Sequence, residues 1–166
     1  MTMHVESRLS LAVVSGFTAG TLATAVQMLL WWLSATPVLE TLLRDARLTA
    51  AIALGQAVLA SEPTWRWDIL LVATLTHFTL SIIYAAIAMP YVRRLSVRLA
   101  IVTGALYGLM LYGINLHALT EFMPWFSVSR GWVTLLTHVI FGITLAGVGR
   151  LLSSTGRGAR NSPARH

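Results

Sequence analysis

Charged residues divide the chain into long uncharged stretches, and the lengths of these stretches predict its secondary structure. Uncharged runs of 31, 24, 22 and 19 residues lie between Arg8 and Glu40, Asp68 and Arg93, Arg98 and Glu121, and Arg130 and Arg150. An α-helix needs about 20 apolar residues to cross a bilayer, and in lipid its backbone must satisfy its own hydrogen bonds. We therefore predict an all-α membrane protein with a single transmembrane domain over residues 1–152. It should be a four-helix bundle with spans at residues 9–34, 68–92, 99–121 and 130–152.

The connection after the first predicted span has a different pattern. Only 14 uncharged residues separate Arg47 from Glu62, a length typical of an interfacial or re-entrant segment rather than a span. On a helix starting near Pro37, the apolar residues of 38–46 share one face, and Arg44, Asp45 and Arg47 lie opposite. We expect residues 37–61 to form an amphipathic helical segment on the outer membrane surface. A lid over the outer mouth of the bundle is the alternative.

The composition supports a membrane location and excludes several other classes. The chain is 56% hydrophobic and only 11% charged, whereas a soluble domain carries roughly 25% charged residues. All of its basic residues except histidine are arginines, and they give a net charge of +6. Because these arginines lie at the ends of apolar runs, we expect them to orient the chain in the membrane and do not expect a nucleic-acid partner. The absence of cysteine excludes disulfides and thiolate metal sites.

The arginines also predict an orientation. The N-terminus, the connection after the second span and the C-terminus hold eight arginines, whereas the other side holds four. The positive-inside rule then places both termini in the cytoplasm. All six tryptophans lie near the opposite ends of the helices, where such rings settle at the headgroup level. Residues 153–166, rich in Gly, Ser and Arg, are predicted to form a disordered basic cytoplasmic tail.

Two parts of the chain align with each other. A shift of 61 residues places Pro63 on Pro124 and His77 on His138, and a shift of 88 places Gly16, Gly20 and Gln27 on Gly104, Gly108 and Asn115. We interpret this as an internal repeat of a two-helix hairpin. Because both copies enter the membrane in the same direction, a pseudo-twofold axis along the membrane normal should relate them.

Small and polar residues share one stripe on each predicted helix. The small residues expected to mediate helix packing are Gly16, Gly20, Gly104, Gly108, Ser81 and Gly142. Small side chains let helices approach closely where lipid offers no hydrophobic drive between them. The polar residues on these stripes, which should point into the bundle, are His77, His138, Gln27 and Asn115. Both histidines should lie near mid-membrane, roughly 13–15 Å below the outer helix ends at 1.5 Å per residue.

An ionisable residue at this depth is a functional-site hypothesis, and three interpretations remain open. The histidines could form interhelical hydrogen bonds with Gln27, Asn115 or threonine hydroxyls. They could ligate haem b between the second and fourth spans, because histidine is a common axial ligand. They could also titrate along a proton or ion path, although no intramembrane Asp, Glu, Lys or Arg accompanies them.

His117 and Glu121 form a second, outer-face candidate. They lie four residues apart near the outer interface, on a different face from Asn115. A pair at this spacing could share a divalent metal if a third ligand were present, but none occurs at helical spacing, so we predict no metal site. A solvated or headgroup-facing pair is the simpler interpretation.

Several short motifs follow one another along the chain: Thr76-His77-Phe78-Thr79-Leu80-Ser81, Pro90, Gly104-Ala105-Leu106, Met123-Pro124-Trp125 and Thr137-His138-Val139. Their order resembles that of the YagU-like family of small bacterial inner-membrane proteins. The match covers about residues 68–150. The resemblance implies a multi-span protein with a loose link to acid tolerance, and it supplies no catalytic residues.

Together these observations predict a multi-pass protein of the bacterial inner membrane without a catalytic site. We expect it to act as an accessory or stress-related protein, as a homodimer or as a small subunit of a larger membrane complex, with the lipid bilayer as its surroundings. The alternative is a haem-binding or proton- or ion-handling bundle that uses His77 and His138.

Overall fold

The computed structural model describes residues 2–60 and 64–160, with side chains described over residues 9–60 and 64–154. Every regular element in this part of the chain is helical. The elements in chain order are α1 (Thr2–Leu33), α2 (Val38–Leu54), η1 (Gln56–Leu59), α3 (Trp67–Val92), α4 (Val97–Gly113), the π-helical turn η2 (Ile114–Ala118), η3 (Leu119–Glu121), η4 (Pro124–Ser129) and α5 (Trp132–Arg160).

Four helical segments are long and apolar enough to cross a membrane. They are Leu9–Leu33, Trp67–Val92, Val97–Glu121 and Trp132–Ser154, all within two residues of the predicted limits. Large apolar side chains on these segments face outward: Leu71, Leu75 and Leu106 are 60%, 59% and 61% exposed. Such exposure is unfavourable in water and normal in lipid. The predicted all-α bundle with four transmembrane helices is confirmed, and the chain is an integral membrane protein.

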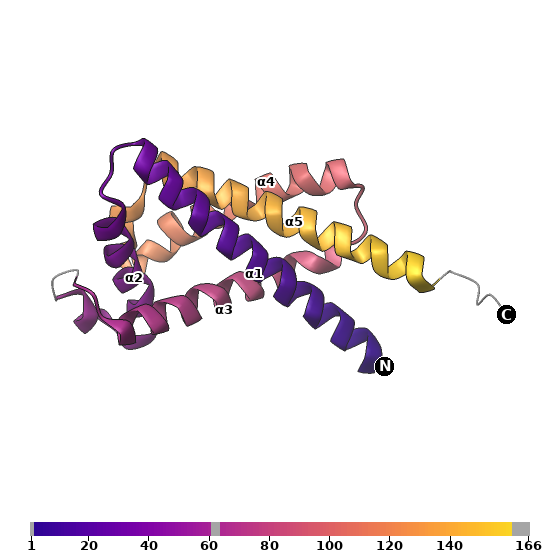
Figure 1. Ribbon diagram of the computed structural model, residues 1–166, viewed down its shortest axis with the longest axis horizontal. Helices are drawn as coiled ribbons and strands as arrows, with labels where there is room; N and C mark the ends of the chain where they lie inside the picture. The colour runs from indigo at the N-terminus through magenta and orange to yellow at the C-terminus, as the bar shows by residue number, and fades with distance from the viewer. Residues whose placement is uncertain (1, 61–63, 161–166) are drawn as a thin grey trace.

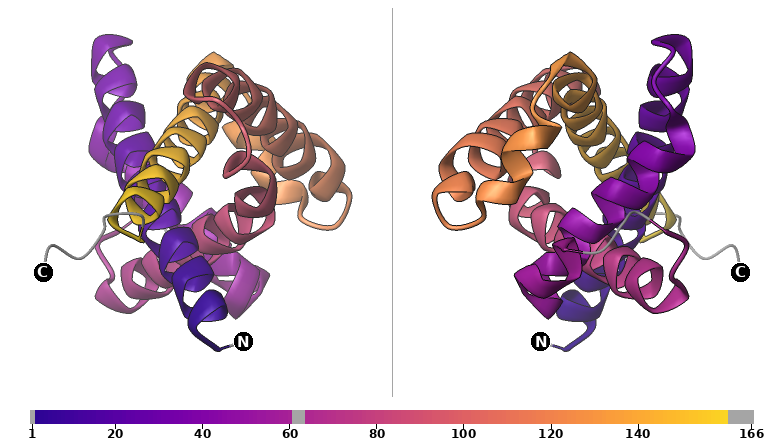
Figure 2. Two further views of the ribbon diagram at one scale, coloured as in Figure 1. Left: turned by 90° about the vertical axis from the view of Figure 1, so that its right-hand side faces the viewer. Right: turned by 90° about the vertical axis from the view of Figure 1, so that its left-hand side faces the viewer.

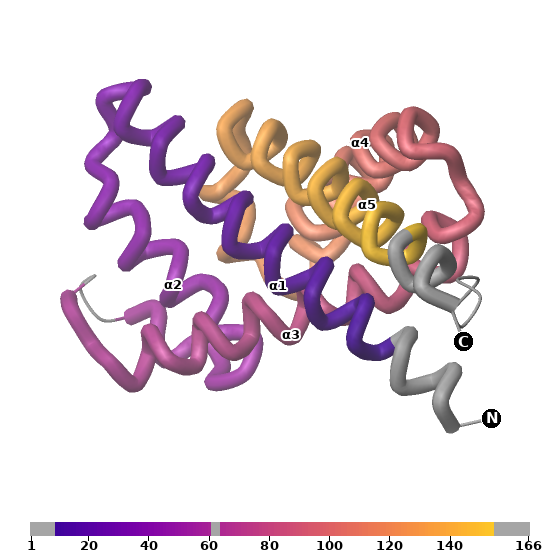
Figure 3. Tube along the Cα trace, turned by 45° about the vertical axis from the view of Figure 1, so that its right-hand side comes forward, coloured from indigo at the N-terminus to yellow at the C-terminus, as the bar shows by residue number. Residues whose placement is uncertain are grey.

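Helix α1 packs against both α3 and α5, and α5 packs along α4. In contrast, α3 and α5 meet over only a short stretch. Figures 1 and 3 show α1 crossing the face of the bundle, with the start of α1 and the end of α5 at the same end of the molecule. We call this the terminal end. At the opposite end, the α2 end, α2 and the segment around η4 cross the bundle, as the right-hand view of Figure 2 shows.

Small residues bring the helix backbones close together from the terminal end to the level of the histidines. A Cβ added at Gly16 of α1 would lie 2.7 Å from the Ser81 carbonyl oxygen of α3, and one at Gly104 of α4 would lie 2.5 Å from the Gly142 carbonyl oxygen of α5. These helix backbones are therefore in direct contact. Around these contacts lies a core of mostly small buried residues, which includes Ala12, Ala19, Ala85, Ala88, Ala100, Leu145 and Ala146. Close van der Waals packing of this kind drives helix association in lipid.

The contacts of the two hairpins correspond position by position. Gly16 meets Ser81 between α1 and α3, as Gly104 meets Gly142 between α4 and α5. One turn closer to the α2 end, Gly20 contacts the His77 ring, and Gly108 contacts the His138 backbone. The shift of 88 residues relates the two glycines of α1 to those of α4. The shift of 61 residues relates Ser81 and His77 of α3 to Gly142 and His138 of α5.

Two element ends differ from the predicted limits. Helix α1 begins at Thr2, before the predicted start of the first span, and α5 continues through Ser153 to Arg160. The predicted disordered tail of residues 153–166 therefore begins inside a helix, and residues 161–166 lie outside the described part of the chain. Pro63, which aligned with Pro124 in the repeat, also lies outside it.

Helix α2 was predicted to expose its charged residues, but Arg47 is buried and Asp45 lines a cavity. It packs against α3, where Ala50 contacts Ile69 and Ala73. Arg47 is only 4% exposed and donates hydrogen bonds to the carbonyl and hydroxyl oxygens of Thr64 at 3.1 and 3.3 Å. The expectation that the three charged residues share an outward face is therefore wrong for Arg47. The sequence pattern suggested one outward polar face on α2. In the structure α2 contacts α1, α3 and η4, so its polar face is partly covered.

The close backbone contact between α4 and α5 should make the stability of the protein sensitive to a larger side chain at Gly142. Gly142→Ala should lower the unfolding temperature of the purified protein, because its Cβ would meet the Gly104 backbone. Overpacking of this kind costs about 1–3 kcal/mol. Gly147→Ala on the same helix is the matched control, since a Cβ there would meet nothing within 4 Å. Thermal unfolding in detergent, followed by circular dichroism, compares the two variants. Equal unfolding temperatures would contradict the tight interface.

Candidate functional site

A partly enclosed cavity of about 670 Å³ occupies the half of the bundle nearest the α2 end. The four transmembrane segments form its walls, and α2 and η4 contribute residues from the α2 end. Most of its lining is apolar, with the aromatic rings of Trp31, Phe78, Tyr84, Phe126 and Phe141 among it. The cavity adjoins the small-residue core, since Ala23, Leu111 and Phe141 belong to both.

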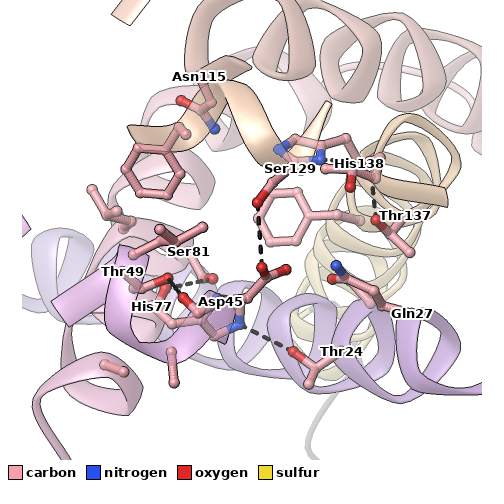
Figure 4. A pocket seen from close by; sticks show the side chains of 18 of the residues that line it. Thr24, Gln27, Asp45, Thr49, His77, Ser81, Asn115, Ser129, Thr137 and His138 are labelled. Atoms are coloured by element: carbon pink, nitrogen blue, oxygen red, sulfur yellow. Dashed lines mark hydrogen bonds between the residues drawn. The ribbon is translucent and has the colours of Figure 1, made fainter. Parts of the chain in front are cut away.

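Polar side chains from six elements face this cavity. They are Thr24 and Gln27 of α1, Asp45 and Thr49 of α2, His77 and Ser81 of α3, Asn115 of η2, Ser129 of η4, and Thr137 and His138 of α5 (Figure 4). All four residues predicted to point into the bundle, His77, His138, Gln27 and Asn115, are in this set. The structure therefore brings these four side chains to one cavity, although Gln27 and His138 are 111 positions apart.

His77 is turned toward α1. Its Nε2 atom lies 3.5 Å from the Thr24 hydroxyl oxygen and would lie 3.0 Å from a Cβ at Gly20. Any larger residue at Gly20 would press on the imidazole, so this glycine makes room for the ring. The arrangement is an interhelical polar contact between α1 and α3, the kind of hydrogen bonding considered in the first interpretation.

His138 is held by its own helix. Its Nδ1 atom lies 2.8 Å from the Thr134 carbonyl oxygen. A carbonyl can only accept, so Nδ1 carries the hydrogen, and Nε2 of the neutral ring presents a lone pair. The ring packs edge-on against Tyr112 of α4, with ring centroids 5.7 Å apart. Each histidine thus packs against the first helix of its own hairpin, while both line the same cavity.

The geometry of the histidines does not fit a bis-histidine haem site. Axial ligation needs a ring nitrogen from each side directed at one iron. The Nε2 atom of His77 is directed at α1 instead, against Thr24 and Gly20. The macrocycle would also have to lie between α3 and α5, which already pack against each other where the Met89 side chain of α3 lies against Gly149 of α5.

Asn115 lies in a π-helical turn that interrupts the third span. Turns of this kind are rare and occur frequently at functional sites. The Tyr84 hydroxyl donates to the Asn115 side-chain oxygen at 2.8 Å, so the amide nitrogen of Asn115 remains available as a donor. Arg130 stabilises the turn by donating to the Leu116 carbonyl at 2.7 Å and to the Thr120 hydroxyl at 2.8 Å.

Asp45 is the site residue that the sequence pattern missed. It was expected on an outward polar face, but its carboxylate lies in the cavity (Figure 4). Arg44 donates to its Oδ1 through Nε at 3.0 Å and Nη2 at 2.8 Å, and the Ser129 hydroxyl donates to the same oxygen at 3.3 Å. Among the described residues, Oδ2 has no hydrogen-bond partner. The sequence did contain a weak indication that Asp45 faces inward. Asp45 lies at helical spacing from Leu42, Thr49 and Ile52, and in the structure all four residues line the cavity.

Two hydrogen bonds join α2 to η4 above the cavity. One is the Ser129–Asp45 bond, and the other runs from the Trp125 indole nitrogen to the Leu48 carbonyl at 3.1 Å. We call α2 and η4, linked in this way, the roof. The roof contributes residues to the lining of the cavity at the α2 end.

His117 and Glu121 lie away from the cavity. Both are exposed, and the His117 ring packs against Tyr112 with centroids 5.5 Å apart. The π turn and the following 3-10 turn change the helical phase between them. Within the described residues, no group of three His, Cys, Asp or Glu side chains could hold a metal ion.

No protein-family model matches the chain, and no curated protein or solved structure matches it either. Its function must therefore be argued from the cavity itself.

The surroundings of Asp45 predict how stability depends on pH. Burial raises the pKa of the Asp45 carboxyl above its ordinary value, and the attraction of Arg44 opposes this effect. When the pKa of a carboxyl is raised in the folded state, its ionised form destabilises the fold, and stability increases as pH falls through that pKa.

Asp45→Asn should therefore unfold at the same temperature as the wild type or higher at neutral pH. The difference should shrink as the pH falls and the wild-type carboxyl is protonated. Unfolding temperatures measured from neutral to acidic pH test this. If the variant were clearly less stable at neutral pH, the Arg44 pair would outweigh the cost of burial.

Proposed function

We propose that this protein is an accessory protein of the bacterial inner membrane that binds a small, largely apolar molecule in the cavity beneath the roof. The observation that carries the proposal is the cavity. Ligand pockets typically measure about 300–1,000 Å³ and combine apolar walls with a few convergent polar groups. A volume of about 670 Å³ and a mainly apolar lining with a small polar cluster meet both criteria.

The way the bundle is built supports binding. Small residues pack the helices closely in the terminal half, and this packing fixes the positions of the helices that line the cavity. Hydrogen bonds at the other end, between Asp45 and Ser129 and between Trp125 and Leu48, hold the roof in place. Tyr84 bridges α3 to Asn115 in η2, which fixes the spacing of two walls. A cavity held open in this way is preorganised, and preorganisation reduces the ordering cost of binding.

The proposal includes an internal duplication as the origin of the fold and the cytoplasm as the location of both termini. The corresponding glycine contacts of the two hairpins support an internal duplication, in which a short connection around Pro124 and the longer one containing α2 came to form the two parts of the roof. The surplus of arginine at the terminal end supports a cytoplasmic location of both termini. The resemblance to the YagU-like family supports a stress-related accessory role, with a homodimer or a larger complex as its setting.

Filling the cavity should abolish binding. Gln27→Trp places a large ring where Gln27 now faces the cavity, whereas Leu29→Trp on the same helix adds the same ring at a position that is 51% exposed. The probe is 9-anthracenemethanol, a neutral apolar fluorophore, and its anisotropy is measured with wild-type and variant protein in nanodiscs. We expect binding to the wild type and to Leu29→Trp, and affinity at least about tenfold weaker for Gln27→Trp, which corresponds to roughly 1.4 kcal/mol. Equal signals from empty nanodiscs and from all three proteins would refute the proposal.

The orientation can be tested separately, because the chain has no cysteine of its own. Ser127→Cys places an exposed thiol at the α2 end, and Ser154→Cys places one at the terminal end. A membrane-impermeant maleimide should label Ser127→Cys from outside spheroplasts and Ser154→Cys only in inverted vesicles. The reverse pattern would place the termini outside.

A further inference from the structure

We infer that the cavity selects an organic cation, a molecule with an apolar body and a protonated amine that binds the Asp45 carboxylate. This inference rests on the proposed binding function and adds the class of ligand. It comes from the distribution of hydrogen-bond donors and acceptors inside the cavity.

Asp45 supplies the anionic end of the site. Its Oδ1 atom accepts from Arg44 and Ser129, whereas Oδ2 has no partner among the described residues. The side chain is 21% exposed, and because Asp45 also lines the cavity, a ligand there can reach the carboxylate. A buried carboxylate with an unpaired oxygen favours a ligand that donates N–H bonds and carries positive charge.

Other groups around the cavity add acceptors and aromatic faces. The bond from His138 Nδ1 to the Thr134 carbonyl leaves its Nε2 as an acceptor in the neutral ring. Gln27 of α1 also lines the cavity, and its side-chain amide carries both an acceptor oxygen and a donor nitrogen (Figure 4). The lining rings include Trp31, Tyr84 and Phe141, and such rings attract cations through their π faces. These features suit an amine better than an anion.

The competing charge is that of Arg44. Its guanidinium binds Asp45 through two nitrogens, but its own side chain is 45% exposed, so water screens it more than it screens the carboxylate. The other carboxylates with described side chains, Glu40, Asp68 and Glu121, are exposed and do not line the cavity. In the described part of the chain, Asp45 is therefore the carboxylate available to a ligand in this cavity.

The inference also predicts the pH dependence of binding. Among the described residues, the titratable or charged groups that contact Asp45 or line the cavity with it are Arg44 on α2, His77 and Tyr84 on α3, and His138 on α5. The described polar residues that α1 and η4 contribute include the uncharged Thr24, Gln27 and Ser129. Acidification neutralises the Asp45 carboxylate, which weakens binding of a cation. The preference for a cation should therefore be largest at neutral pH and fall as the pH is lowered.

The experiment compares two probes of nearly the same shape. 9-Anthracenylmethylamine is protonated at neutral pH, whereas 9-anthracenemethanol is neutral. Anisotropy titrations in neutral-lipid nanodiscs, with empty nanodiscs subtracted, give the affinity ratio of amine to alcohol. We expect the wild type to bind the amine about tenfold more tightly. Asp45→Asn should reduce this ratio to about one. The ratio is the readout, because any change in the roof alters the affinities for the amine and the alcohol alike.

Two further variants keep the test decisive. Glu40→Gln removes an exposed carboxylate from the same helix and should keep the wild-type ratio. Arg44→Gln removes the competing guanidinium and should raise the ratio, so a fall in the ratio would overturn the inference. If the wild type binds amine and alcohol equally well, the cavity binds apolar molecules without charge selection, and the cation inference fails alone. If neither probe binds, or Gln27→Trp binds both like the wild type, the proposed function itself fails.

Discussion

Direct contact between helix backbones in the terminal half of the bundle is the constraint on which the rest of this structure depends. Lipid provides no hydrophobic force to bring helices together, so association requires close van der Waals packing. Gly16 against Ser81, and Gly104 against Gly142, provide that packing in the two hairpins. Toward the α2 end, beyond Gly20 and Gly108, larger and polar side chains line the cavity.

The polar groups of the cavity are arranged by helix packing as much as by hydrogen bonding. Gly20 makes room for the His77 ring, and the Thr134 carbonyl fixes the hydrogen of His138 on Nδ1. Asp45 enters from the roof rather than from a transmembrane helix. A carboxylate introduced from the end of the bundle stays close to the solvated surface, where its charge costs less than at the bilayer centre. The roof thus supplies the carboxylate of the cavity, whereas Asp68 and Glu121 of the transmembrane segments are exposed and do not line it.

The candidate site could be predicted from the sequence in part. His77, His138, Gln27 and Asn115 lay on the same stripes as small residues, and that pattern was sufficient to place them in the interior. The direction of each ring could not be predicted, because it depends on single neighbours: Thr24 and Gly20 for His77, and Tyr112 for His138. Asp45 was missed because the arginines on either side of it suggest an exposed face, whereas Arg47 is buried against Thr64.

The sequence by itself determined the number of spans, their limits and the residues that face inward. These features follow from the length and polarity of local segments, since lipid requires each helix to satisfy its own backbone. Only the tertiary structure decided which helices touch, that α2 and η4 close over a cavity, and that a π turn presents Asn115 to it. These features arise from contacts between residues distant in the chain, such as Trp125 with Leu48 and Ser129 with Asp45. Periodicity within one segment carries no information about contacts of that kind.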